Sequence, residues 1–216
     1  MSTHRFVRHT SAIAATIAVL ALAACATPRV GDAASPAGAA GTAPPPPSGE
    51  VLGQGTVIDV AGEAEFCLGA IMESHPPQCD GIPLTHWSWD GVQGSESSGD
   101  ATWGAYALVG TYDGKSFSST QEPIMLALFD PAITKDPTGG VNGTTEVARL
   151  EEIQSEIDTS GTIAPLSSTI DRGYLWVRVT WDDGTLQQLA DATYGPDVVV
   201  VQSALQPIGE KSQIDK

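Results

Sequence analysis

Apolar and polar residues alternate in short segments through the first half of the globular sequence. Such alternation, bounded by turn-forming residues, is typical of β-strands. The predicted strands cover residues 56–60, 65–71, 85–89, 106–112, 116–120 and 124–129. Asp113-Gly114 lies between two of them, and Asp-Gly is a strong hairpin signal. Six short strands with tight turns predict a small barrel or sandwich over residues 51–130.

The pattern changes to helical spacing in the second half. Apolar residues recur every three or four positions over 147–157, which predicts a helix. Residues 174–181 alternate again, a short helix is predicted over 186–193, and 198–201 is an apolar strand. A strand, a helix and a strand in so short a stretch indicate a βαβ unit. The sequence therefore predicts an α+β fold, in which a β-rich small barrel or sandwich is followed by an α/β part (helix, strand, helix, strand) over residues 131–208.

An apolar stretch of a different kind opens the chain. The first ten residues hold Arg5 and Arg8 and no acid, and residues 12–24 are apolar apart from Thr16. A basic start followed by a short apolar region is typical of a secretory signal peptide. A helix of this length rises only about 20 Å, which is short of the roughly 30 Å hydrocarbon core of a membrane. We therefore expect residues 1–24 to be a signal peptide and not a permanent span.

The apolar stretch ends in Leu22-Ala23-Ala24-Cys25, which resembles the lipobox of bacterial lipoproteins. The resemblance implies cleavage before Cys25 and attachment of diacylglyceryl and palmitate-type acyl chains to this residue. Two or more acyl chains anchor a protein stably where one does not. The chain is thus expected at the cell membrane, held by its lipid on the extracytoplasmic side. The alternative is an ordinary secreted protein, cut at a nearby small residue, in which Cys25 has no role.

Low-complexity sequence follows the lipobox. Residues 26–50 are mostly Ala, Pro, Gly, Ser and Thr, and prolines occupy every position from 44 to 47. This segment has too few large apolar side chains for a core, so 25–50 is predicted to be the lipidated cysteine and a disordered linker. The polar residues 209–216 are predicted to form a frayed tail. The globular region therefore lies between residues 51 and 208.

The charge of the chain narrows the range of partners. The sequence holds 26 Asp and Glu residues against 10 Lys and Arg, a net charge of −16. Removal of residues 1–24 takes away Arg5 and Arg8 and no acid, so the net charge becomes −18. A surface of this sign repels nucleic acid and anionic lipid headgroups. We therefore expect no nucleic-acid partner, and contact with the membrane only through the N-terminal lipid.

The chain has three cysteines, and an odd number in an exported protein needs an explanation. If Cys25 is lipidated, Cys67 and Cys79 remain, and two thiols in an oxidising compartment most simply form a disulfide. The alternative is a metal site, because His75 and His86 lie in the same stretch as these cysteines. The spacing lacks the close cysteine pairs of common structural zinc sites. We therefore predict a disulfide, with no metal and no other cofactor.

Several short motifs resemble those of a family of exported actinobacterial proteins of unknown function. In the front half they are Cys67-Leu68-Gly69, Pro76-Pro77-Gln78-Cys79, Trp87-Ser88-Trp89, Trp103-Gly104 and Gly110-Thr111-Tyr112-Asp113-Gly114. The back half carries weaker ones, which are Asp183-Gly184, Leu186-Gln187, Tyr194-Gly195 and Ser203-Ala204-Leu205-Gln206-Pro207. The resemblance implies an exported domain and brings no activity with it. His75 and His86 are not the usual residues of this family, which argues against a family-wide role for them.

The residues of a hydrolase are hard to find in this sequence. After removal of residues 1–24 only two histidines remain, no Ser stands three residues before a Lys, and there is no Gly-x-Ser-x-Gly motif. Asp182 and Asp183 are adjacent, so on a strand they would point to opposite sides, and with Gly184 they are typical of a turn. We therefore predict that the protein is not an enzyme.

The candidate ligand-binding residues are Trp87 and Trp89, together with His75 and His86. On a strand the two tryptophans would share a face and could stack on the sugar rings of a cell-wall glycan, although aromatic rows in β domains more often belong to the core. The favoured function is a lipid-anchored, non-catalytic binding or interaction module of the cell envelope, with another envelope protein or a cell-wall glycan as partner. The alternative is an extracytoplasmic lipoprotein that binds a small ligand or a metal. A deep pocket lined by these residues would favour the alternative, and a filled barrel would favour the interaction module.

Overall fold

A computed structural model describes residues 43–130 and 135–208 of the chain. The predicted signal peptide, the predicted lipidation of Cys25 and the predicted tail at 209–216 lie outside the described residues, as does the predicted linker up to residue 42. Within the described ranges, no helix combines the length and the apolar character needed to cross a membrane.

The described residues form two successive groups of elements. The first group consists of β1 Val51–Val60, β2 Glu63–Cys67, β3 Ile82–Thr85, β4 Glu96–Ser98, β5 Ala101–Tyr112, β6 Phe117–Ser119, β7 Ile124–Met125 and the 3-10 helix η1 Leu126–Leu128. The second group consists of α1 Val147–Ser160, β8 Ser167–Asp171, β9 Tyr174–Val179, α2 Thr185–Tyr194, β10 Val199–Ser203 and β11 Gln206–Pro207. We call residues 51–130 the barrel half and residues 135–208 the α/β half.

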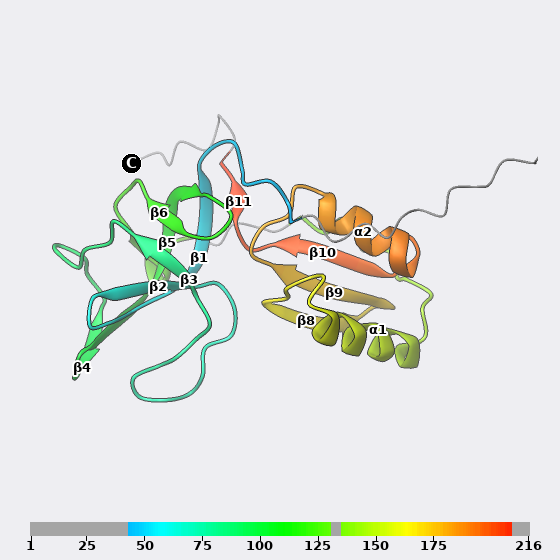
Figure 1. The fold of residues 1–216 in the computed structure, drawn as a ribbon, viewed down its shortest axis with the longest axis horizontal. Coiled ribbons are helices and arrows are strands. Elements are labelled where there is room, and N and C mark those ends of the chain that lie inside the picture. Colours follow the sequence, from blue (N-terminus) through cyan, green and yellow to red (C-terminus); the bar gives the residue numbers. More distant parts are fainter. Residues whose placement is uncertain (1–42, 131–134, 209–216) are drawn as a thin grey trace, which may run out of the picture. The chain divides into compact units, whose positions relative to one another are not determined.

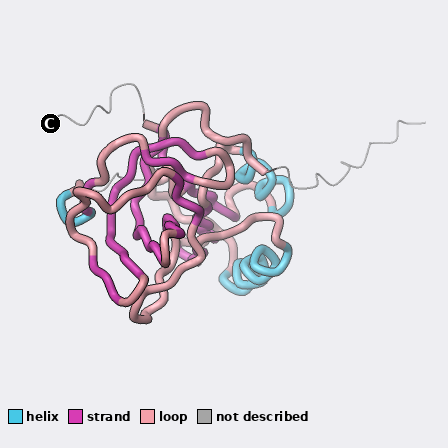
Figure 2. The backbone as a smooth tube through the Cα atoms, turned by 60° about the vertical axis from the view of Figure 1, so that its left-hand side comes forward, coloured by secondary structure: helices cyan, strands magenta, loops and turns pink. Residues whose placement is uncertain are grey.

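Five strands of the barrel half close into a barrel (Figure 1). Their order is β1-β2-β3-β6-β5, and β5 pairs again with β1, from Val51 opposite Gly110 to Val60 opposite Ala101. β3 and β6 run parallel, whereas the other pairs around the barrel are antiparallel. Figure 2 shows these strands wrapped around a common interior. The predicted small barrel is therefore confirmed.

Two glycines allow β1 to take part in this closure. A Cβ atom at Gly53 would lie 2.6 Å from the ring of Phe66, and one at Gly55 would collide with the carbonyl oxygen of Cys67. A side chain at either position would therefore push β1 away from β2. Because the first strand stays close to its neighbours, it pairs with β2 near its end and with β11 near its start.

The order and directions of the five strands are those of the OB-fold, a Greek-key barrel. Folds of this type carry many unrelated activities, so the topology by itself assigns none to this chain. OB barrels bind oligonucleotides across their second and third strands. In this chain β2 presents the exposed carboxylates of Glu63 and Glu65, which disfavour contact with phosphate groups.

Apolar side chains fill the interior of the barrel. Tyr106, Phe66 and Phe117 are fully buried, and the rings of Phe66 and Phe117 lie with their centroids 5.3 Å apart. The other buried members of this cluster are Val51, Val57, Leu68, Leu84, Leu108, Ala204 and Leu205. Burial of so many large side chains is the main favourable contribution to folding of this half. The interior of the barrel is therefore a hydrophobic core.

The α/β half is built around a three-stranded sheet in the order β10-β9-β8. β8 and β9 form a hairpin, whereas β9 and β10 are parallel and are connected through α2, which confirms the predicted βαβ unit. Helix α1 contacts β8 and β9, and α2 contacts β10 (Figure 1). Apolar residues from both helices and from β9 share one cluster, which includes Leu150, Ile153, Ile157, Leu175, Val177, Leu186 and Ala190.

Several predicted element boundaries are wrong. The strand predicted at 85–89 ends at Thr85, because His86 takes a positive φ of 59° that turns the chain out of the sheet. The strand predicted at 65–71 ends at Cys67, and the run 124–129 is a two-residue strand followed by a 3-10 helix. Strand β8 was not predicted, because its alternation of Ser, Thr and Ile carries little apolar signal.

The two halves contact each other through the C-terminal strand. β11 pairs with β1, and the residues just before it, Ala204 and Leu205, belong to the buried cluster of the barrel. Trp181, which follows β9, also packs against that cluster. The described residues accordingly fall into one compact unit.

Candidate binding cleft beside the aromatic loop

The loop after β3 carries Trp87 and Trp89 back over the barrel core. We call residues 86–94 the aromatic loop. The rings of Trp87 and Trp89 meet edge to face with centroids 5.1 Å apart, and they lie 6.0 and 6.2 Å from the ring of Tyr106. Both tryptophans are partly buried and pack against the barrel cluster. The expected placement on one face of a strand is therefore wrong, because the aromatic loop folds them onto Tyr106.

Hydrogen bonds hold the aromatic loop in place. The indole N–H of Trp89 donates to Oδ2 of Asp59 over 3.0 Å, and the hydroxyl of Tyr106 donates to the carbonyl oxygen of Gln93 over 2.9 Å. The backbone N–H of Val92 donates to the carbonyl of Trp89 over 3.1 Å. Burial raises the pKa of Tyr106, so its hydroxyl stays protonated and remains a donor. The loop is thus tied to the barrel at Trp89 and at Gln93.

An open cleft of about 370 Å³ lies beside the aromatic loop. One wall is formed by residues 90–93 of the loop, and the other by residues 122–125 and Leu128. We call this the Leu128 cleft. Its apolar lining comes from Val92, Pro123, Ile124, Met125 and Leu128. This volume lies near the lower end of the range of small-molecule pockets.

The second wall of the Leu128 cleft is anchored on the barrel. Met125 in β7 pairs with Tyr106 in β5, which places this wall against the same tyrosine that fixes the aromatic loop. A side chain at Gly94 would collide with the sulfur of Met125, and Gly94 has a φ of 78°, so this close approach needs glycine. The 3-10 helix then projects Leu128 outward, and this side chain is 73% exposed. Leu128 thus adds an exposed apolar side chain to the apolar lining of the cleft.

Two carboxylates stand at the rim of this cleft. Asp90 and Glu122 are exposed and belong to its lining. Lys115 is the only Lys or Arg between residues 51 and 130, so little positive charge from the barrel half offsets them. The cleft therefore combines apolar lining residues with two exposed carboxylates, which complements an apolar group flanked by positive charge.

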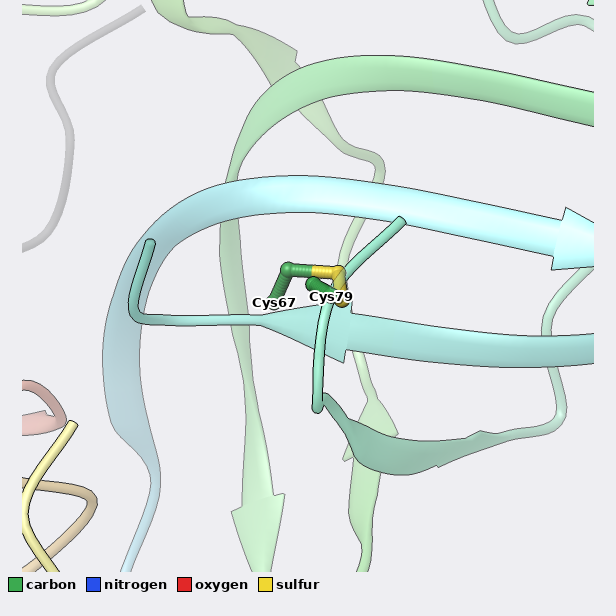
Figure 3. The surroundings of a disulfide bond; sticks show 2 residues. All are labelled: Cys67 and Cys79. Atoms are coloured by element: carbon green, nitrogen blue, oxygen red, sulfur yellow. A yellow bond between two sulfur atoms is a disulfide. The ribbon is translucent and has the colours of Figure 1, made fainter. Parts of the chain in front are cut away.

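The cysteines lie elsewhere in the barrel half. Cys67 at the end of β2 and Cys79 in the following loop form a disulfide (Figure 3). The loop that they close folds on itself, since Met72 and Gln78 form a β-bridge inside it. The predicted disulfide is therefore present, and both thiols are used in it.

The structure does not bring the two candidate histidines together. The ring of His75 lies edge-on to Trp103 of β5, with centroids 5.3 Å apart. Nδ1 of His86 lies 3.1 Å from the hydroxyl of Ser118. Both side chains are exposed, and neither lines the Leu128 cleft. The four candidate ligand-binding residues thus occupy three separate places.

A metal site would need several ligating side chains in one place. Among residues 43–130 and 135–208, no three His, Cys, Asp or Glu side chains group in a way that could hold an ion. Because Cys67 and Cys79 are bonded to each other, they cannot act as thiolate ligands. The sequence-based metal alternative has no set of ligands in the described part of the chain.

Sequence reasoning missed the residues of the Leu128 cleft. The run 124–129 was interpreted as an apolar strand, and nothing in its composition marks Leu128 as the exposed member. Asp90 and Gly91, which directly follow the predicted strand 85–89, also line the cleft. Pro123 marked only where a strand could begin, because proline within sheets is confined to edge strands, bulges and the first residue of a strand.

Compared with known protein families, with curated proteins and with solved structures, the chain matches none.

Proposed function

We propose that the chain is a lipid-anchored, non-catalytic interaction module on the extracytoplasmic side of the cell membrane, and that it binds another envelope protein through the Leu128 cleft. The lipobox-like sequence ending at Cys25 supports the anchor. The acidic chain supports a domain held near the membrane by its lipid and not by contact with anionic headgroups.

The filled barrel is the observation that carries the proposal. Tyr106, Phe66 and Phe117 are fully buried in the barrel interior, which favours a recognition surface on the outside. The Leu128 cleft combines an exposed leucine, a lining fixed by hydrogen bonds and β pairing, and a rim of two carboxylates. Because the residues that line the cleft are already fixed, they lose little conformational entropy when a partner binds, which favours affinity.

The cleft favours a protein partner over a glycan. Sugar rings stack on exposed aromatic faces, but Trp87 and Trp89 pack on each other and on Tyr106. An apolar side chain flanked by Lys or Arg would fill the floor and meet Asp90 and Glu122. We therefore propose a partner segment of that chemistry.

The anchor is tested with Cys25→Ala. Because the acyl chains supply the membrane affinity, the variant should leave the membrane fraction or accumulate as uncleaved precursor. Cells expressing the variant and the wild type are fractionated, and the chain is followed by immunoblot. Mature Cys25→Ala protein that still sediments with membranes would contradict a lipid anchor.

The binding surface is tested by photo-crosslinking in living cells. A photoreactive amino acid replaces Leu128 in one variant and Val141 in a matched control, since these side chains are 73% and 66% exposed. We expect a discrete adduct from position 128 only, and we expect Asp90→Asn with Glu122→Gln to reduce its yield. Equal adducts from both positions, or none from position 128, would overturn the proposed surface.

A second candidate is supported by the size of the same cleft. About 370 Å³ could also hold a small apolar ligand, as the alternative lipoprotein function requires. Native mass spectrometry of the chain released from membranes distinguishes the two functions. An added mass of constant value that disappears in Leu128→Asp would favour the small ligand. If the wild type carries no added mass, the protein partner is favoured.

A further inference from the structure

The proline run of the predicted linker contacts the folded domain. The indole N–H of Trp181 donates to the carbonyl oxygen of Pro45 over 2.9 Å. Pro44 and Pro47 are partly buried. Residues 43–50, which composition assigned to a disordered linker, therefore make defined contacts, and ordered structure begins before residue 51.

A groove continues beside this contact. It has a volume of about 300 Å³, and its lining includes Pro44, Tyr112 and Trp181 together with the apolar residues Val179 and Leu186. The groove thus has two aromatic side chains, an apolar base and an indole donor that already meets a proline carbonyl. Each of these features belongs to residues outside the Leu128 cleft.

Consecutive prolines favour the polyproline II conformation, whose carbonyl oxygens have no partner within the helix. Grooves lined by aromatic side chains bind such segments, because the prolines fit between the rings and little chain entropy is lost. An N–H group that donates to a proline carbonyl also fixes the orientation of the bound segment. We infer that the Tyr112–Trp181 groove and the Trp181 indole form a recognition site for polyproline II segments, and that the chain's own proline run, which binds Trp181 through Pro45 and lines the groove through Pro44, acts as an intramolecular latch.

The residues next to the proline run favour binding of that run to the groove of the same molecule. Glu50 accepts a hydrogen bond from the hydroxyl of Thr120, and its carbonyl accepts one from the N–H of Ile208 over 3.2 Å. Glu50 is therefore fixed only a few residues beyond the run. A short link of this kind supplies an effective concentration of about millimolar, so even a weak site is filled by its own segment. Residues 43–50 are therefore held against the folded domain.

The latch is tested by NMR on the 15N-labelled full chain. The Trp181 indole resonance is assigned by its loss in Trp181→Phe. The test variant carries Pro44→Gly, Pro45→Ser, Pro46→Gly and Pro47→Ser, and the control carries Pro28→Gly and Pro36→Gly. The other four tryptophan indole resonances report whether each variant is folded.

We expect the Trp181 indole resonance to move toward the position of a solvent-exposed indole in the test variant and to stay unchanged in the control. A free peptide with the sequence of residues 43–48, added at about 10 mM, should return the resonance toward its wild-type position, because it exceeds the effective concentration of the tethered run. An unchanged resonance in the test variant would overturn the latch. A moved resonance that the peptide does not restore would overturn polyproline recognition, since the contact would then depend on the tether alone.

Discussion

The barrel half and the α/β half reach a stable fold with different interactions. The barrel half holds eleven Asp and Glu residues and a single base, Lys115, and the ion pairs found in the described residues all lie in the α/β half. The barrel half instead has the disulfide and the aromatic contacts of Trp87, Trp89 and Tyr106. In the α/β half, Arg172 pairs with Asp136 and Asp171 and lies over the ring of Trp176.

The two halves are therefore stabilised by different kinds of contact. Exposed ion pairs contribute little to stability, so the α/β half depends mainly on its helix-to-sheet packing. The barrel half keeps its acidic surface free of paired bases and fixes its loops by covalent and aromatic contacts. Because the aromatic loop is held in this way, the Leu128 cleft beside it can stay open. The predictions below test this division, beginning with the largest expected effect.

The first prediction concerns whether the two halves unfold together. Phe117→Ala should cost about 3–5 kcal/mol, because it removes a fully buried ring from the barrel core. Leu205 of the α/β half belongs to the same cluster, so the loss should reach both halves. Hydrogen exchange followed by mass spectrometry should show faster global opening in β5 and in β9 alike.

Ile153→Ala in α1 is the matched variant for the other half, and it should cost about 2–5 kcal/mol and also affect both strands. Val147→Ala, at a side chain that is 57% exposed, is the control and should change neither. If Phe117→Ala accelerates exchange in β5 while β9 keeps its protection, the halves are independent domains and the shared cluster does not couple them.

The second prediction concerns the disulfide of the barrel half. Replacing Cys67 and Cys79 together by Ala should lower the free energy of unfolding by roughly 3 kcal/mol, because the closed loop restricts the unfolded chain. Pro76 and Pro77 already stiffen this loop, which reduces the gain. Urea unfolding of the variant and of the reduced wild type measures the effect, and no change in either would show that the bond contributes nothing to stability.

The sequence predicted the α/β half more accurately than the barrel half. The period of Val147, Leu150, Ile153 and Ile157 and the alternation from Tyr174 onward reflect elements packed on one side, so they marked α1, β9, α2 and β10 correctly. In the barrel half, Thr85 to Trp89 alternates like a strand, but the residues after Thr85 form a loop. Alternation cannot reveal a positive φ at His86 or the return of Trp87 onto Tyr106, because both depend on contacts distant in sequence.

The candidate site was less accessible to sequence reasoning than the fold. Cys67 and Cys79 could be paired by elimination, because few partners exist for two exported thiols. The Leu128 cleft depends on the pairing of β7 with β5 and on the close approach of Gly94 to Met125, which no local pattern records. The proline run was recognised as stiff, but its partner Trp181 lies 136 residues away along the chain.

The third prediction concerns the edge of the sheet in the α/β half. The side-chain amide of Gln187 donates to the carbonyl of Val199 over 2.9 Å and accepts from the N–H of Val201 over 2.8 Å. It thereby covers the free edge of β10, a strand that contains three consecutive valines. Gln187→Leu should cost about 1 kcal/mol and promote self-association through this edge.

Gln188 is the matched control, since it is the exposed neighbour in the same helix. Light scattering and urea unfolding of Gln187→Leu and Gln188→Leu separate edge protection from a general effect of an added leucine. Equal self-association of the two variants would show that Gln187 does not protect the edge.

The fourth and smallest prediction concerns acid. The backbone N–H groups of Ser116 and Lys115 donate to Asp113 and lower its pKa, and the hydroxyl of Thr138 and the guanidinium of Arg172 lower that of Asp136. A lowered folded-state pKa means that each carboxylate stabilises the fold above its unfolded value of about 3.9 and loses this contribution as the pH falls through the folded value. Asp113→Asn should therefore reduce stability at pH 7 and flatten its decline in acid, measured by urea unfolding between pH 7 and 2. An unchanged pH profile would contradict the role of these hydrogen bonds.

The intact mass of the chain extracted from membranes tests the central claim most directly. A lipid-anchored extracytoplasmic module should begin at Cys25, carry the added mass of a diacylglyceryl group and a further acyl chain, and weigh two hydrogens less than its reduced form because of the Cys67–Cys79 bond. A chain that retains residues 1–24, or one that begins elsewhere and carries no lipid, would contradict the account.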